Sequence, residues 1–204
     1  MSGNPATLLP PDIARSISRE EMLELPIRRY EGPVRVVASD EDLADAVRDL
    51  GEERVVGFDT ETRPAFRVGE RYLPSLVQFA TANAVYLFQV QQQDFSAAIR
   101  EVLGSPRIVK AGVSVSHDLK TLKEVFPFDA EVVVDLGRVA TRHGLGQTGV
   151  RNLAAIFLGM RIPKGAKTTN WAAARLTAQQ IGYAATDAWI CRELYLRFEA
   201  LGLT

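Results

Sequence analysis

Short apolar runs alternate with amphipathic segments along most of this chain, and that alternation constrains the fold more than any other feature. A bounded apolar run of about four to eight residues is typical of a buried strand, whereas apolar residues every three or four positions are typical of a helix. After an early hairpin, single strands alternate with helices. This order indicates a mixed β-sheet covered by helices.

The same patterns predict the individual elements. We expect strands over residues 33–39, 55–61, 75–81, 84–90, 107–115 and 131–135. We expect helices over residues 18–25, 40–52, 95–104, 118–126, 136–144, 150–160 and 176–201. Asp40 is the expected N-cap of its helix, and the turn at Ala82 and Asn83 joins the two strands of the hairpin.

The N-terminal part differs from the rest in its richness in proline and charge. We expect residues 1–33 to form an extended arm with one short helix. Residues 34–204 then form a single domain, which is long enough to bury a full core.

Composition narrows the class of protein. The formal net charge of -1 gives no global basic field, so a polyanionic partner would have to meet a local patch. A single cysteine, Cys191, excludes an internal disulfide and indicates a reducing compartment. No signal peptide is visible, and no stretch approaches the roughly 18 apolar residues of a spanning helix. We therefore expect a cytoplasmic protein without a membrane partner.

Two acids close the apolar run VVGFDTET. Asp59 and Glu61 are separated only by Thr60, and alternate side chains of an extended chain share a face. Like charges held together raise each other's pKa, so the pair either lies in water or binds a positive charge.

Three further acids lie on predicted helices or at the end of a predicted strand. Tyr183 and Asp187 are four residues apart and share a helix face in YAATDAW, where the carboxylate is surrounded by apolar residues and needs a partner. Asp118 opens a predicted helix, and Asp135 closes a predicted strand. Both also fit a capping role, and the residue patterns do not separate them.

Clustered carboxylates without His or Cys ligands favour a hard divalent cation, Mg²⁺ or Mn²⁺, over zinc. Such sites often hold two metals about 3.5–4 Å apart, which clamp the attacking and leaving oxygens of a phosphoryl displacement. The expected chemistry is therefore phosphodiester hydrolysis with two divalent cations as cofactors.

Three segments in order, GFDTET, AGVSVSHDLKTL and YAATDAW, resemble the three motifs of the DEDD superfamily of 3'–5' exonucleases. Tyr183, four residues before the last Asp, is similar to the marker of the tyrosine branch. Finer features, among them PSLVQFA and TTNWAAARLTAQQ, resemble the exonuclease domain of the Werner syndrome helicase and its relatives more than ribonuclease D. The segment HGLGQTGVRN has no strong counterpart in the family.

The resemblance implies a ribonuclease H-like α/β fold, a mixed β-sheet flanked by α-helices. It also implies roles for five residues. Asp59 corresponds to the ligand that bridges both metals, and Glu61 and Asp187 to ligands of the metal that holds the attacking water. The resemblance selects Asp118, rather than Asp135, as the carboxylate that serves the second metal. Tyr183 corresponds to the residue that orients or helps to deprotonate the water.

The expected function is metal-dependent release of nucleoside monophosphates from the 3' end of DNA. The alternatives are RNA trimming of the ribonuclease D type and a non-catalytic nucleic-acid-binding module on the same fold. A basic loop that leads to the last helix fits a single-stranded end, because cations contact phosphates and aromatic rings stack on bases. The expected nucleic-acid contacts are Thr60, Lys164, Lys167, Asn170 and Trp171. The alternative is a solvated loop in which Trp171 anchors the following helix in the core.

Overall fold

A six-stranded mixed sheet organises the computed structural model, which describes residues 9–165 and 168–204. The strand order is β1-β4-β3-β2-β5-β6. The strands are β1 (Val34–Val36), β2 (Val55–Thr62), β3 (Pro74–Ala80), β4 (Val85–Phe88), β5 (Val109–Gly112) and β6 (Val133–Asp135).

The strand directions follow the predicted hairpin and crossovers. Strand β3 pairs antiparallel with both β2 and β4, whereas β5 pairs parallel with β2 and with β6. The parallel strands β2, β5 and β6 therefore end at the same edge of the sheet, and this edge carries the acids that the sequence singled out. The prediction of a mixed α/β sheet is confirmed.

Seven helices are present in the described part of the chain. They are α1 (Arg19–Glu24), α2 (Asp40–Glu52), α3 (Ser96–Gly104), α4 (Val115–Leu122), α5 (Leu136–Arg142), α6 (Val150–Leu158) and α7 (Ala178–Ala200). The expectation that Asp40 caps α2 is wrong. Ser39 is the cap, because its extended backbone lets its hydroxyl accept from the Asp42 amide while the Asp42 carboxylate accepts from the Ser39 amide.

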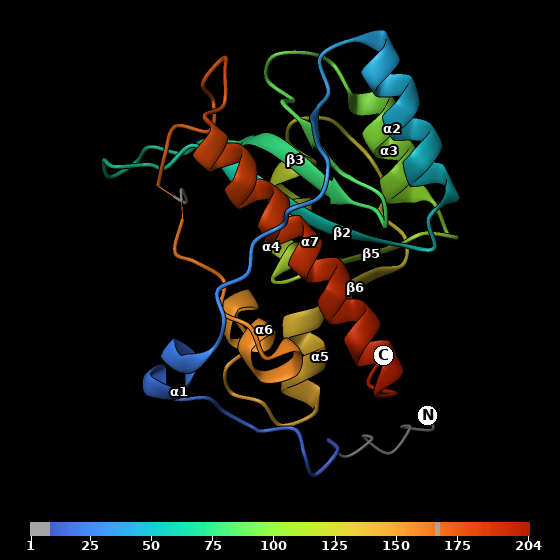
Figure 1. The fold of residues 1–204 in the computed structure, drawn as a ribbon. Helices are drawn as coiled ribbons and strands as arrows, with labels where there is room; N and C mark the ends of the chain where they lie inside the picture. Colours follow the sequence, from blue (N-terminus) through green and yellow to red (C-terminus); the bar gives the residue numbers. More distant parts are fainter. Residues whose placement is uncertain (1–8, 166–167) are drawn as a thin grey trace.

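The helices cover both faces of the sheet (Figure 1). Helices α2, α3 and α4 bury one face in an apolar cluster that contains Phe58, Phe79 and Phe88. The long helix α7 crosses the other face, where small residues such as Ala184 and Ala188 pack on β3 and β4. Helices α5 and α6 pack against the C-terminal half of α7.

The described part of the N-terminal segment, residues 9–33, runs along the surface of the domain (Figure 1). It contains α1 and an isolated bridge between Ile27 and Arg161. Leu9 is buried in the cluster beneath α5, α6 and α7. Across residues 9–165 and 168–204, no helix has both the length and the apolar character needed to cross a bilayer.

Candidate active site

Three carboxylates meet where α7 crosses the end of β2. Asp59, Glu61 and Asp187 each offer an oxygen that lies within 4.8 Å of the other two. Asp59 pairs with Gln78 and Glu61 pairs with Leu76 across β2 and β3, on the face that packs against α7. The alternation of the strand thus places both acids toward the helix that carries Asp187, as the sequence predicts.

A glycine allows the helix to approach the strand this closely. A Cβ atom built on Gly57 would lie 1.9 Å from the backbone oxygen of Ala188. Real Cβ atoms do not approach backbone so closely, so any larger residue at position 57 would push α7 away from β2. Because Asp59 lies two residues after Gly57 and Asp187 lies one residue before Ala188, this contact sets the separation of the carboxylates.

Asp59 lies in a strongly perturbed electrostatic environment. Burial raises the pKa of Asp59 well above its ordinary value, and the negative charges of Asp187, Glu61 and Asp118 raise it further. No Lys or Arg forms a salt bridge with Asp59 in the described ranges. A cation bound beside Asp59 would offset the repulsion from these neighbouring carboxylates.

The structure separates Asp118 from Asp135. Asp118 in the first turn of α4 accepts a hydrogen bond of 2.6 Å from the Thr60 hydroxyl, on the strand between the two acids. Burial raises the pKa of Asp118, and the Thr60 hydrogen bond partly offsets that increase. Asp135 instead caps α5, where its Oδ1 accepts from the backbone amides of Gly137 and Arg138, and it also accepts from the Ser114 amide. Asp135 is thus a helix cap that ties α5 to the start of α4.

Tyr183 lies on the same face of α7 as Asp187. Burial raises the pKa of the Tyr183 hydroxyl far above its ordinary value, and so do Asp187 and Glu61; the Asp187 carboxylate also accepts a hydrogen bond from it. The ring of Tyr183 lies 6.0 Å from that of Trp171, measured between centroids. A Cβ atom on Gly165 would collide with the Tyr183 ring, so the loop before α7 also depends on a glycine to approach the site.

The expected nucleic-acid contacts have different outcomes. Trp171 is 0% exposed in the apolar cluster beneath α7, which favours its role as a core anchor over a contact with a base. The buried Thr60 hydroxyl donates to Asp118 and positions that carboxylate, which argues against direct contact with a substrate. Lys164 and Asn170 are exposed near the site and stay predictions. Lys167 lies outside the described residues.

Gln78 is a feature that the sequence did not reveal. Its side chain is 0% exposed beside Asp59, and neither its amide nitrogen nor its amide oxygen has a hydrogen-bond partner in the described part of the chain. An unpaired buried amide is costly and rare. The only sequence signal is a glutamine within an otherwise apolar strand, which also fits a satisfied core residue.

The donor set fits a hard divalent cation. All of its ligand atoms are carboxylate oxygens, the type that Mg²⁺ and Mn²⁺ prefer. The same charges that raise the pKa of Asp59 would favour cation binding in their midst. Asp59, Glu61 and Asp187 would hold such an ion, with Asp118 adjacent through Thr60.

Comparison with known proteins points to one family. A family model described as 3'-5' exonuclease matches residues 34–201. The chain is 29% identical over 212 residues to the exonuclease mut-7 homolog of Homo sapiens, covering 87% of this chain and 24% of that protein. It is 30% identical to the mouse bifunctional 3'-5' exonuclease/ATP-dependent helicase WRN, and the match covers 76% of this chain and 12% of that protein. It is 31% identical to ribonuclease D of Haemophilus influenzae, and the match covers 79% of this chain and 40% of that protein.

A solved structure with a similar fold is the EXO domain of Aedes aegypti Nibbler. It has a TM-score of 0.75 at 24% identity, and the match covers 85% of this chain and 91% of that one. This similarity supports the ribonuclease H-like arrangement of sheet and helices. The chain spans less than half the length of each of the three relatives named above.

Proposed function

The chain belongs to the 3'–5' exonuclease family, and from that premise we propose that it hydrolyses phosphodiester bonds from the 3' end of DNA. The observation that carries the proposal is the cluster of Asp59, Glu61 and Asp187 within 4.8 Å, with Tyr183 and Asp118 beside it. Water adds to the terminal phosphorus while the bond to the 3' oxygen of the preceding nucleotide breaks. That oxygen takes a proton, and a nucleoside 5'-monophosphate leaves.

The carboxylates of Asp59, Glu61 and Asp187 would hold the divalent cations, and Asp118, which is linked to the cluster through Thr60, would be the further ligand. When bound, the cations supply electrostatic stabilisation of the negative charge that develops on the phosphoryl oxygens.

Tyr183 orients the attacking water. In the metal-free protein its pKa is raised far above the ordinary value, so the hydroxyl stays protonated at neutral pH. That proton is donated to Asp187, which leaves the hydroxyl oxygen free to accept a hydrogen bond from water. This hydrogen-bond geometry supports an aligning role for Tyr183.

The test is the substitution Asp59→Ala. With 5'-labelled single-stranded DNA and Mn²⁺ or Mg²⁺, we expect wild-type protein to shorten the strand and the variant to lose on the order of a thousand-fold in rate. Calorimetric titration should show a matching loss of Mn²⁺ affinity. Glu101→Ala, which removes an exposed carboxylate on α3, is the matched control and should behave as wild type. Wild-type activity in the Asp59 variant would refute the assignment.

RNA is the second candidate substrate. The observation in its favour is the 31% identity to a protein named ribonuclease D over 79% of this chain. Initial rates on DNA and RNA strands of one sequence separate the two candidates. A faster rate on RNA would replace DNA in the proposal and leave the carboxylate roles unchanged.

A further inference from the structure

A surface groove lies on the flank of α4 that faces away from Thr60 and Asp118. It has a volume of about 750 Å³ and lies between α4, β6 and α5, and we call it the α4–α5 groove. It is lined by Val115, Ser116, Leu119, Lys120, Lys123, Glu124, Ala130, Val133, Val134, Asp135, Arg138, Val139 and Arg142. Its volume lies in the range typical of ligand sites in proteins.

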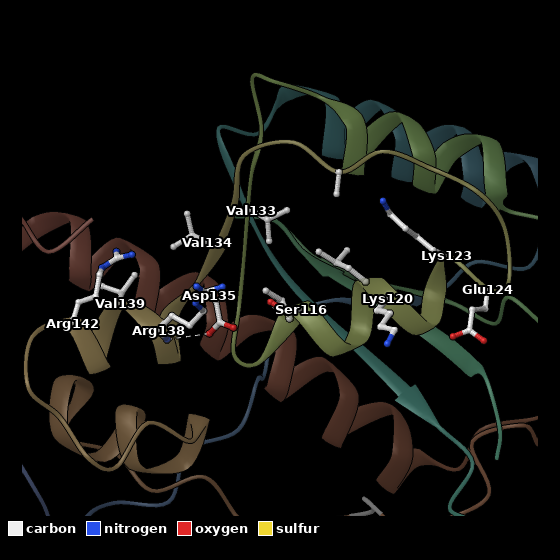
Figure 2. Close-up of a pocket in the computed structure, with 13 residues that line it drawn as sticks. Ser116, Lys120, Lys123, Glu124, Val133, Val134, Asp135, Arg138, Val139 and Arg142 are labelled. Carbon is white, nitrogen blue, oxygen red and sulfur yellow. Dashed lines mark hydrogen bonds between the residues drawn. The ribbon is translucent and has the colours of Figure 1, made fainter. Parts of the chain in front are cut away.

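The charges of the groove come from two helices. Lys120 lies on α4 and Lys123 is its C-cap residue, whereas Arg138 and Arg142 lie on α5, so that positive side chains stand on both sides (Figure 2). All four are exposed. Arg138 and Arg142 have no acidic group within salt-bridge distance in residues 9–165 and 168–204.

The two acids that line the groove are already engaged elsewhere. Glu124 forms an ion pair of 2.5 Å with Arg71, in the loop between β2 and β3. Asp135 Oδ1 accepts three backbone hydrogen bonds as the cap of α5. Lys123 forms an ion pair of 3.8 Å with Asp129, whereas Lys120, Arg138 and Arg142 form none in the described part of the chain, so the groove keeps positive charge on both sides.

The floor of the groove is apolar. Val133 and Val134 on β6 lie between the cations of α4 and those of α5 (Figure 2), and Leu119 and Val139 also line the groove. Apolar surface flanked by cations fits a chain whose bases are apolar on their faces and whose phosphates are charged. The proposed function favours a nucleic-acid strand over an acidic peptide as the occupant of the groove.

We propose that the α4–α5 groove binds the single-stranded part of the substrate that lies on the 5' side of the nucleotide being removed. Phosphates lie against Arg138, Arg142 and the lysines of α4, and the bases contact the apolar floor. This proposal rests on the proposed function, because it takes the carboxylate cluster as the place where the 3' end lies.

The position of the groove fits this path. Asp118 lies on one flank of α4, whereas Ser116, Lys120 and Lys123 lie on the other, in keeping with the period of the helix. A helix with its side chains is only about 10–12 Å across, so a strand leaving the carboxylates crosses the first turn of α4 within a few nucleotides. Strands of about three nucleotides should therefore be too short to reach the groove.

The experiment measures binding against strand length. Fluorescence anisotropy in EDTA, which prevents hydrolysis, gives the affinity of labelled strands of three and ten nucleotides for wild type and for Arg138→Gln/Arg142→Gln. We expect the double variant to bind the ten-nucleotide strand about ten-fold more weakly and the three-nucleotide strand unchanged. The slope of log affinity against log salt for the long strand should fall by about 1.4, because each lost phosphate contact on a single strand contributes about 0.7.

The matched control is Arg100→Gln/Arg107→Gln. These two exposed arginines line a different cavity beside α3, and their removal should leave both strands bound as in wild type. An equal loss for both lengths, no loss for either, or the same loss in the control overturns the proposal. A further outcome also overturns the proposal. If free nucleoside monophosphate binds wild type but not the double variant, while both proteins bind the strands equally well, the groove is a mononucleotide site.

The experiment distinguishes failure of the groove proposal from failure of the proposed exonuclease function. The double variant should still hydrolyse the three-nucleotide strand in Mn²⁺ at the wild-type rate. If wild type hydrolyses neither strand, the exonuclease proposal fails, whatever the anisotropy shows. If hydrolysis is normal and the length dependence of binding is the same in variant and wild type, only the groove proposal fails.

Discussion

Asp59 links the chemistry of the site to the stability of the metal-free protein. Its pKa in the folded chain is raised by burial and by three neighbouring carboxylates, whereas an unfolded Asp titrates near pH 4, at about 3.9. Between these two pKa values the folded state binds the proton more tightly than the unfolded state. The stability that this group contributes is therefore complete below the unfolded pKa and is lost as the pH rises through the folded pKa.

This sign predicts that Asp59→Asn stabilises the metal-free protein at neutral pH. We expect the free energy of unfolding by urea in EDTA at pH 7 to rise by about 1–2 kcal/mol, because the neutral amide removes an uncompensated buried charge. The difference should shrink as the pH falls toward 4 and wild-type Asp59 takes up its proton. Asp129→Asn, at a fully exposed acid, should change little. A variant less stable than wild type at pH 7 would contradict this account of the electrostatics.

At single residues, the sequence predicts those features that depend on local periodicity. The alternation of β2 predicts that Asp59 and Glu61 share a face, and the helical period predicts the same for Tyr183 and Asp187. The roles of Asp118 and Asp135 depend instead on where α4 begins, which is set by Ser114 with its left-handed backbone (φ 62°). No periodicity reports such a backbone, so those two acids could not be separated.

The sequence of a basic loop leaves the role of its aromatic residue open at this scale. Trp171 fits both a stacking surface and a core anchor, and its side chain is fully buried beneath α7. The cluster that buries it includes Leu76 on β3, which is distant in sequence, so the burial depends on the tertiary fold.

At the scale of elements, the approach of α7 to β2 is the contact on which the candidate site depends. We expect Gly57→Ala to lower the free energy of unfolding by about 1–3 kcal/mol, because the added Cβ overpacks against the Ala188 backbone. Displacement of α7 should also separate Asp59 from Asp187 and weaken Mn²⁺ binding. Urea unfolding and calorimetric titration measure the two effects.

Gly51→Ala is the matched control for this substitution. A Cβ atom at Gly51 meets nothing within 4 Å, and the residue lies in the last turn of α2. The change should leave Mn²⁺ affinity unaltered and leave stability equal or slightly higher, since alanine favours a helix more than glycine does. Unchanged Mn²⁺ affinity in the Gly57 variant would show that the carboxylates tolerate a shift of the helix.

The elements themselves were largely predictable, whereas their contacts were not. Short apolar runs give the strands, and amphipathic spacing gives α2, α3 and α6, because these patterns are local. The close passage of α7 over Gly57 depends on a pair of residues more than a hundred positions apart. A glycine within a strand indicates close approach of some backbone but not which one.

At the scale of the whole molecule, the described part of the N-terminal segment runs across the domain and contacts both the loop before α7 and α7 itself. The Arg161 amide donates to the Pro26 carbonyl at 2.9 Å, and the Arg28 amide donates to the Arg161 carbonyl at 3.0 Å. The ring of Tyr30 lies 5.9 Å from that of Trp189 on α7. We propose that residues 34–204 form the catalytic domain and that residues 1–33 are an arm that holds the loop before α7.

Removal of residues 1–33 should therefore lower thermal stability. We expect a fall in Tm of about 5 °C or more. This fall corresponds to a loss of about 1–3 kcal/mol in the free energy of unfolding, because each kcal/mol shifts Tm by about 2–4 °C in a domain of this size. Tyr30→Ala should give part of that fall, and Glu31→Ala, at an exposed neighbour, should give none. Scanning calorimetry measures all three, and an unchanged Tm after truncation would mean that the arm adds no stability.

The contact at Gly57 also limits how such a sequence can diverge. Because the added atom would meet the backbone of Ala188 and Arg192, rather than a side chain, no substitution on α7 can make room for it. A second-site suppressor of Gly57→Ala would have to displace the whole helix, and that displacement moves Asp187. Selection for folding alone would therefore recover suppressors that selection for metal binding rejects.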